Sequence, residues 1–207
     1  ANLNNADLSN ANLGYASLEN ANLDNADLSY AELDFANLAY ASLENADLYD
    51  ADFMKLLKHT LIPKDINASD YKAVYYVGGG AAMFGVPENK EIQHISRTIY
   101  ENKGVVSAVC HGTAGIVNLK NNDGTYLFAN KEVNGFPDLF EDKKADYYKT
   151  FPFSIEGIIK ERGGNFSYSE KGWDNYYKVD GRLITGQDPT AAATVAKEII
   201  KKLNTLK

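Results

Sequence analysis

The sequence predicts two regions of different fold class: a β-solenoid over residues 1–55 and an α/β domain with a parallel sheet over residues 56–207. The first prediction follows from a five-residue repeat that occurs eleven times in succession. The second follows from the alternation of strand-like apolar runs with helix-like periodicity beyond residue 70. A glycine triplet and the single cysteine each follow a predicted strand, which points to a functional site in the second region.

Every repeat begins with Ala and has Leu at its centre, except that Phe53 replaces Leu in the last one. An amphipathic helix is excluded, because successive Leu side chains would rotate by about 140° around its axis. A continuous strand is excluded too, because an odd period sends successive Leu side chains to opposite faces. If the chain turns a corner after each repeat, all Ala and Leu point inward and four repeats complete one coil. The A-[DN]-L-x-x pattern resembles the pentapeptide-repeat family and its right-handed quadrilateral β-helix.

The charge of the chain is concentrated in this first region. Residues 1–55 contain seven Asp, three Glu and one Lys, a net charge of −9, whereas the remainder carries +2. Such a surface keeps the repeats soluble, or it attracts a basic protein partner. The resemblance adds a third alternative, because some pentapeptide-repeat proteins are thought to mimic DNA and bind type II topoisomerases. No Lys/Arg patch or nucleic-acid motif is found, so we expect no nucleic-acid partner.

The composition also bears on location. No run of 18 apolar residues and no charged-then-apolar signal segment is present, so we expect no membrane association. Cys110 is the single cysteine, which rules out an internal disulfide and fits a reducing compartment. Together these features predict a cytoplasmic protein.

Beyond residue 70 the chain alternates between predicted strands and helices. Strands are predicted over 73–80 and 104–109, and helices over 89–103, 111–120, 154–164 and 190–203. Asp-Gly pairs at 123–124 and 180–181 predict tight turns. This alternation predicts a parallel sheet, in which functional residues gather at the carboxyl ends of the strands.

Two candidate site features follow predicted strands in this way. The backbone N–H groups of Gly78, Gly79 and Gly80 can face a ligand without obstruction by side chains. Cys110 and His111 stand between a strand and a helix, as in a nucleophile elbow. The helix N-terminus after Cys110 is expected to lower the pKa of the thiol and to favour the nucleophilic thiolate.

Four segments in this order resemble the ThiJ/PfpI superfamily, and specifically its glyoxalase III and Hsp31-type chaperone branch. They are DYKAVYYVGGGAAMF (70–84), VVSAVCHGTAGIVNL (105–119), VNGFPDLFE (133–141) and VDGRLITGQDP (179–189). The resemblance covers about residues 54–205. It implies a class I glutamine-amidotransferase-like fold with a flavodoxin-like parallel sheet.

The resemblance also implies roles for individual residues. Cys110 corresponds to the nucleophile, His111 to its partner in a Cys-His dyad and Glu141 to the acid that orients the histidine. The amides of Gly79 and His111, next to Gly78, correspond to the oxyanion hole. These roles imply a cysteine-dependent, glyoxalase III-like enzyme that converts methylglyoxal or related reactive aldehydes to hydroxy acids without glutathione, metal or organic cofactor. A ThiJ/PfpI-type hydrolase is the alternative enzyme class, because the shared motif residues do not select the substrate. Members of the superfamily commonly dimerise, so the resemblance allows a homodimer and leaves the oligomeric state open.

The remaining histidines and aromatic residues receive no catalytic role. His59 and His94 have no partner pattern and are expected to be exposed or packed on helices. Trp173, with Tyr176 and Tyr177, is expected to pack beneath a pair of strands.

The chain departs from the superfamily pattern at two points. Gly80 stands where the glyoxalase III branch usually has His. The usual first strand–helix–strand unit, with a Glu that contacts the nucleophile, has no counterpart, so the sheet is expected to be incomplete. That unit precedes Ala1, is replaced by the repeats, or is supplied by another chain. The alternative to an enzyme is therefore a non-catalytic fusion or degenerate protein whose solenoid is a scaffold or an acidic protein-binding surface.

Overall fold

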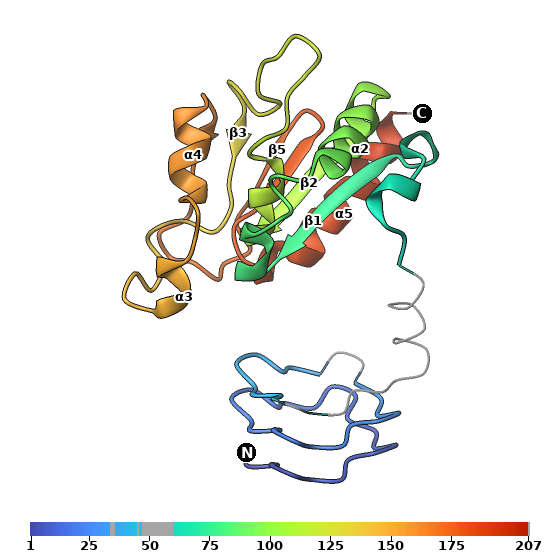
Figure 1. The fold of residues 1–207 in the computed structure, drawn as a ribbon, viewed down its shortest axis with the longest axis vertical. Helices are drawn as coiled ribbons and strands as arrows, with labels where there is room; N and C mark the ends of the chain where they lie inside the picture. The colour runs from blue at the N-terminus through green and yellow to red at the C-terminus, as the bar shows by residue number, and fades with distance from the viewer. Residues whose placement is uncertain (34–35, 45, 47–59, 207) are drawn as a thin grey trace. The chain divides into compact units, whose positions relative to one another are not determined.

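The computed structural model describes residues 1–33, 36–44, 46 and 60–206 (Figure 1). It divides the chain into two compact units, Ala1–Leu61 and Ile62–Lys207, which we call the N-terminal and C-terminal units. Each unit contains its own cluster of buried apolar side chains. None of the helices in the described residues has the length and apolar character that a bilayer span requires.

Parallel bridges in the N-terminal unit join residues twenty positions apart, which is four repeats. They begin with Asn2 and Asn22 and continue in steps of five residues. A second set of hydrogen bonds closes a turn in each repeat, as where the N–H of Ala6 donates to the Leu3 carbonyl at 3.0 Å. The five-residue pattern is therefore expressed in the backbone hydrogen bonding as well as in the sequence.

The predicted inward-facing Ala and Leu side chains form the core of this unit. The fully buried members are Leu18, Ala21, Leu23, Ala26, Leu28 and Ala31. The last residue of the repeat has a positive φ, between 53° and 59°, at Asn5, Asn10, Tyr15, Asn20, Asn25, Tyr30 and Tyr40. Asn adopts this left-handed conformation more readily than most residues, which accounts for its frequency at the corner.

The C-terminal unit is an α/β domain. Its strands are β1 (Ala73–Gly78), β2 (Val105–Cys110), β3 (Glu132–Val133), β4 (Asn165–Phe166), β5 (Tyr177–Asp180) and β6 (Leu183–Gly186). Its α-helices are α2 (Lys90–Glu101), α3 (Asp146–Lys149), α4 (Ile155–Glu161) and α5 (Ala192–Thr205). Short 3-10 helices are η1 (Pro63–Asp65), η2 (Ala68–Asp70), η3 (Gly80–Met83), η4 (His111–Ile116) and η5 (Pro189–Ala191).

The main sheet has the strand order β1-β2-β6-β5, and β3 pairs with β4 separately. Strands β1, β2 and β6 are parallel, whereas β5 is antiparallel to β6. The expectation of a wholly parallel sheet is thus wrong at β5. The Asp180-Gly181 pair makes the predicted tight turn, and a turn of this length can join only antiparallel strands.

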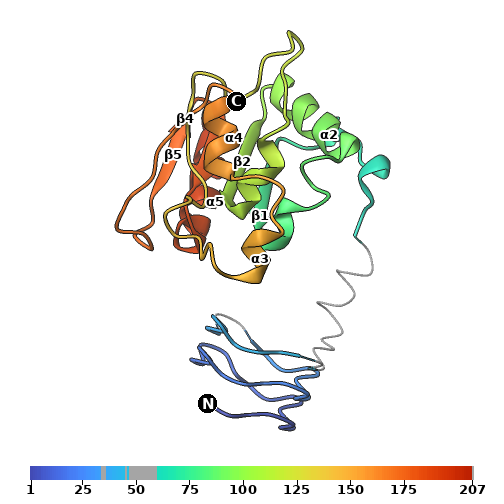
Figure 2. The same cartoon turned by 60° about the vertical axis from the view of Figure 1, so that its left-hand side comes forward.

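Helices cover both faces of the sheet (Figures 1 and 2). On one face, α5 packs Val195 and Ile199 against Val105 and Val109 of β2. On the other face, α4 contributes Ile155 and Ile159 to a second cluster, which also contains partly buried side chains of α2. Every residue of β2 is buried, which explains why this strand is a continuous small and apolar run rather than an alternating one.

Three of the four predicted helices are present, as α2, α4 and α5. The helix predicted over 111–120 is wrong, because the chain forms only the 3-10 helix η4 over His111–Ile116. Gly112 and Gly115 lower helix propensity and let the segment lie directly on Tyr76 of β1. The packing expected for Trp173 is also wrong, because this side chain is 52% exposed, whereas Tyr176 and Tyr177 are half-buried.

The close contact between η4 and β1 predicts a sharp sensitivity at Gly112. A Cβ atom there would lie 2.3 Å from the Tyr76 carbonyl oxygen, whereas a Cβ at Gly79 would meet nothing within 4 Å. We expect Gly112→Ala to lower the free energy of unfolding by about 1–3 kcal/mol, as overpacking does. Gly79→Ala is the control and should change it far less. Urea denaturation of the full chain measures both, and equal losses would contradict this account of the packing.

Candidate active site

Cys110 ends β2 in a conformation that is rare for a residue with a side chain. Its φ is 58° and its ψ is −135°. Such a conformation costs about 1–3 kcal/mol and persists only where the surrounding structure enforces it. Here β2 is paired on both sides, and the chain after Cys110 turns at once into η4. The predicted sharp turn between strand and helix is therefore present.

Cys110, His111 and Glu141 form a chain of contacts. The Cys110 sulfur lies 3.4 Å from Nδ1 of His111, and Nε2 of His111 lies 2.8 Å from a carboxylate oxygen of Glu141. The His111 and Glu141 side chains are only 10% and 5% exposed. Because a carboxylate only accepts, Nε2 carries the hydrogen, and Nδ1 is left as an acceptor facing the thiol.

Two aromatic side chains hold the His111 ring in this orientation. Phe136 stacks on it at 4.6 Å between ring centroids, and Phe151 meets it edge-on at 5.5 Å. The N–H of Phe136 also donates to the Cys110 carbonyl at 3.3 Å. Sequence analysis assigned neither residue a role. Phe136 lies within the GFPDLFE segment and could have been found there, whereas nothing in the sequence marks Phe151.

The glycines after β1 lie beside this chain. Gly78 is the register partner of Cys110, and a Cβ on Gly78 would lie 2.6 Å from the backbone nitrogen of Gly112. Gly78 is therefore required for close packing of the two strand ends. Gly79 borders open space instead. The assignment of the Gly79 and His111 amides as an oxyanion hole stays a prediction.

The expected activation of the thiol by a helix N-terminus is wrong. Burial raises the pKa of Cys110 to about 12, and the charges of Asp188 and Glu141 act in the same direction. The backbone N–H of His111 lowers the pKa, but by less than burial raises it. The segment after Cys110 is a short 3-10 helix, and the thiol is almost fully covered, so desolvation of the thiolate outweighs the donor.

Asp188 is a buried acid that sequence analysis did not single out. Its carboxylate accepts hydrogen bonds from the N–H groups of Trp173 and Thr190, at 2.9 and 3.0 Å. It thereby joins the loop before β5 to the start of η5, and its negative charge helps to raise the pKa of Cys110. The QDP sequence in the VDGRLITGQDP segment is the signal that could have identified it.

Of the two other histidines, His94 alone lies among the described residues. His94 is exposed on α2, as expected, and His59 lies outside the described residues. Within the part of the chain that is described, no group of three His, Cys, Asp or Glu side chains could hold a metal ion.

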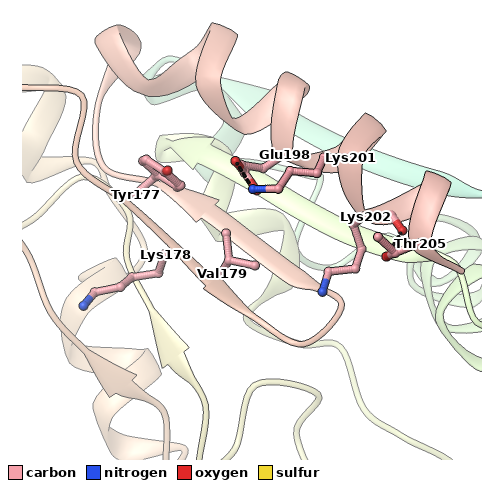
Figure 3. Close-up of a pocket in the computed structure, with 7 residues that line it drawn as sticks. All are labelled: Tyr177, Lys178, Val179, Glu198, Lys201, Lys202 and Thr205. Carbon is pink, nitrogen blue, oxygen red and sulfur yellow. Dashed lines mark hydrogen bonds and ion pairs between the residues drawn. The ribbon is translucent and has the colours of Figure 1, made fainter.

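A groove of 490 Å³ between β5 and α5 contains none of the predicted site residues (Figure 3). Its lysines are largely paired, since Lys178 contacts Glu132 at 3.6 Å and Lys201 contacts Glu198 at 3.1 Å. Lys202 extends from α5 on the same side. We therefore assign no part of the reaction to this groove, despite its size.

Known proteins are similar to about three quarters of this chain in sequence and in fold. Glyoxalase 3 of Candida albicans is 32% identical over 157 residues, which cover 72% of this chain and 64% of that protein. Glutathione-independent glyoxalase HSP31 of Saccharomyces cerevisiae is 35% identical over 161 residues, covering 73% of this chain and 65% of that protein. The crystal structure of glyoxalase III from Candida albicans superposes with a TM-score of 0.67 at 30% identity, covering 76% of this chain and 71% of that one.

The chain thus spans slightly less than two thirds of the length of these two curated relatives. Eight copies of the pentapeptide repeat match residues 1–34, and the sequence profile of the DJ-1/PfpI family matches residues 36–202. Both predicted resemblances are confirmed: the chain carries pentapeptide repeats at its N-terminus and belongs to the DJ-1/PfpI family.

Proposed function

We propose that this protein is a cysteine-dependent glyoxalase that converts methylglyoxal or related reactive aldehydes to hydroxy acids without glutathione. The observation that carries the proposal is the contact chain from Cys110 through His111 to Glu141, set at a strained strand end. The names of the two curated relatives support the same reaction. Because the chain spans only part of their length, the activity is a proposal for this protein.

The first step is addition of sulfur to the aldehyde carbon. His111 Nδ1 faces the thiol and takes its proton as the S–C bond forms, so Cys110 does not have to ionise beforehand. Glu141 stabilises the imidazolium that results. The electron pair of the C=O bond moves to oxygen, where the N–H groups of Gly79 and His111 would stabilise it. Loss of one such donor typically costs about 2.7–4 kcal/mol.

The second step is an internal transfer that needs no external oxidant. With methylglyoxal, a proton leaves the former aldehyde carbon, which becomes a thioester, and the neighbouring ketone becomes an alcohol. The imidazolium of His111 first gives the thiol's proton to the substrate oxygen, and the neutral ring then carries the proton from one carbon to the next. Water then cleaves the thioester: its oxygen enters the acid, and a proton returns to the sulfur. The sum is methylglyoxal plus water to lactate, with Cys110 regenerated.

We propose the following organisation for the whole chain. Residues 1–55 form a right-handed quadrilateral solenoid, a proposal that the twenty-residue bridge spacing supports. Residues 56–207 form an incomplete flavodoxin-like domain. The position of β1 at one edge of the sheet, with Val77 68% exposed, supports this incompleteness. We further propose a cytoplasmic homodimer whose acidic repeats bind a basic protein.

A non-catalytic role is the second candidate, and the high pKa of Cys110 favours it. A buried thiol that holds its proton is typical of a structural cysteine. In that case the repeats act as a scaffold or an acidic binding surface. The two candidates differ in turnover, which the next prediction measures.

Substitution of the proposed nucleophile gives the most direct test. Cys110→Ala should abolish conversion of methylglyoxal to lactate, because no other thiol exists in the chain. Lys202→Gln, in the groove between β5 and α5, should leave the rate of methylglyoxal conversion unchanged. The assay follows methylglyoxal loss and lactate formation together. Absence of turnover in the parent protein would reject the enzymatic proposal and leave the scaffold role.

The elevated pKa predicts how fast Cys110 reacts with iodoacetamide. At pH 7 the folded chain should react more slowly than the same chain unfolded in urea, whose thiol has an ordinary pKa of about 8.5. Because the folded pKa is about 12, the thiolate fraction and the rate should rise about tenfold per pH unit between pH 7 and 10. A rate that levels off above pH 7 would show that the thiolate is already formed.

Glu141 is a positioning residue, since it acts through His111. Glu141→Gln should lower kcat/KM by about 10²-fold, with most of the loss in kcat, because the neutral amide no longer stabilises the imidazolium. The pH profile should change as well, which a purely structural role would not produce. A loss confined to KM, or a rate that falls only in step with unfolding, would contradict the assignment.

A further inference from the structure

A second cavity, of 390 Å³, lies on the α2 side of the C-terminal unit. Lys90, Gln93 and Arg97 line it from a single face of α2, since they stand at positions i, i+3 and i+7. Asn118 and Lys120 line it from the segment after η4. Cys110, His111 and Glu141 are absent from its lining, so it is separate from the candidate active site.

The floor of this cavity is fixed by hydrogen bonds. The side-chain amides of Gln93 and Asn118 both donate to the Pro87 carbonyl, at 2.6 and 2.8 Å. Arg162 donates to the Asn118 side-chain oxygen at 2.7 Å and to the Val117 carbonyl at 2.6 Å. The two walls are therefore held at a set spacing before any ligand arrives, which reduces the entropy lost on binding.

Among residues 60–206, no carboxylate lies within ion-pair distance of Lys90, Arg97 or Lys120. Lys120 instead lies 4.8 Å from the ring centre of Tyr126, and Lys90 makes only a long contact of 3.4 Å to Gln93. In the groove beneath α5, by contrast, Lys178 and Lys201 are paired with acids.

The cavity lies in the part of the chain whose net charge is +2, and not in the acidic repeats. Three cations without an acidic partner in the described part of the chain line this one cavity, and the first turn of α2 adds the partial positive charge of a helix N-terminus. The complement of this surface is a compact anion with at least two charges, which Lys and Arg recognise through charge-assisted hydrogen bonds.

We propose that this cavity binds a small phosphate monoester that carries hydroxyl groups. The phosphate contacts Lys90, Arg97 and Lys120. The one carboxylate in the lining, Glu88, can only accept hydrogen bonds and so faces a hydroxyl of the organic part. A volume of 390 Å³ exceeds what a bare phosphate fills and lies within the usual range for small-molecule sites.

Calorimetric titration of the full chain with glycerol 3-phosphate, at constant ionic strength set by NaCl, tests the proposal. We expect saturable binding of one molecule per chain that is tighter than the binding of inorganic phosphate. The double variant Arg97→Gln/Lys120→Gln should weaken binding by about tenfold or more, because two charged donors are lost. Lys202→Gln is the control: it removes one positive charge from α5, outside the cavity, and should change the affinity by less than twofold.

Two further variants make the result decisive. Glu88→Gln should reduce the advantage of glycerol 3-phosphate over inorganic phosphate while it strengthens the binding of phosphate itself. Cys110→Ala should bind glycerol 3-phosphate as the parent does, whether or not the parent turns over methylglyoxal. If the double variant does not fold, Arg97→Gln alone should still weaken binding severalfold. No binding by the parent, or equal weakening by Lys202→Gln, would overturn the proposal.

Discussion

The candidate site depends on one constraint, the sharp turn at which β2 becomes η4. Cys110 adopts its strained conformation because β1 and β6 hold β2 on both sides, and because Gly78 and Gly112 let the two strand ends approach without side chains between them. The same turn places His111 directly after the thiol and brings its ring against Phe136 and Phe151. A larger residue at either glycine would separate the strand ends and, with them, the sulfur from the imidazole.

The electrostatics of the site favour the protonated form of the Cys110 thiol. Desolvation keeps Cys110 protonated, and the nearby acids reinforce this effect. His111 compensates, since Glu141 fixes its tautomer with a free nitrogen toward the sulfur. In the reaction proposed above, the proton leaves the sulfur only when a bound carbonyl can take the developing charge.

Sequence analysis could predict the features that arise from local pattern and motif. The five-residue repeat, the helices α2, α4 and α5, and the association of Cys110, His111 and Glu141 all belong to this group. It failed where contacts between residues distant in the sequence determine the local conformation or the pKa. The chain after Cys110 became a 3-10 helix because Gly115 has to lie against Tyr76, and the thiol pKa rose because side chains remote in sequence bury it. Phe151 and the unpaired cations around Lys120 come from segments that meet only in the folded chain.

Among the described residues of the N-terminal unit, each bridge joins a repeat to the repeat four places before or after it. The stability of this unit is therefore a sum of nearest-neighbour terms rather than the property of one global core. Whole sets of four repeats can be gained or lost by duplication or deletion without disturbing the remaining ones. A change of length there leaves the remaining bridges in place, whereas loss of β1 or β6 would leave β2 unpaired on one side.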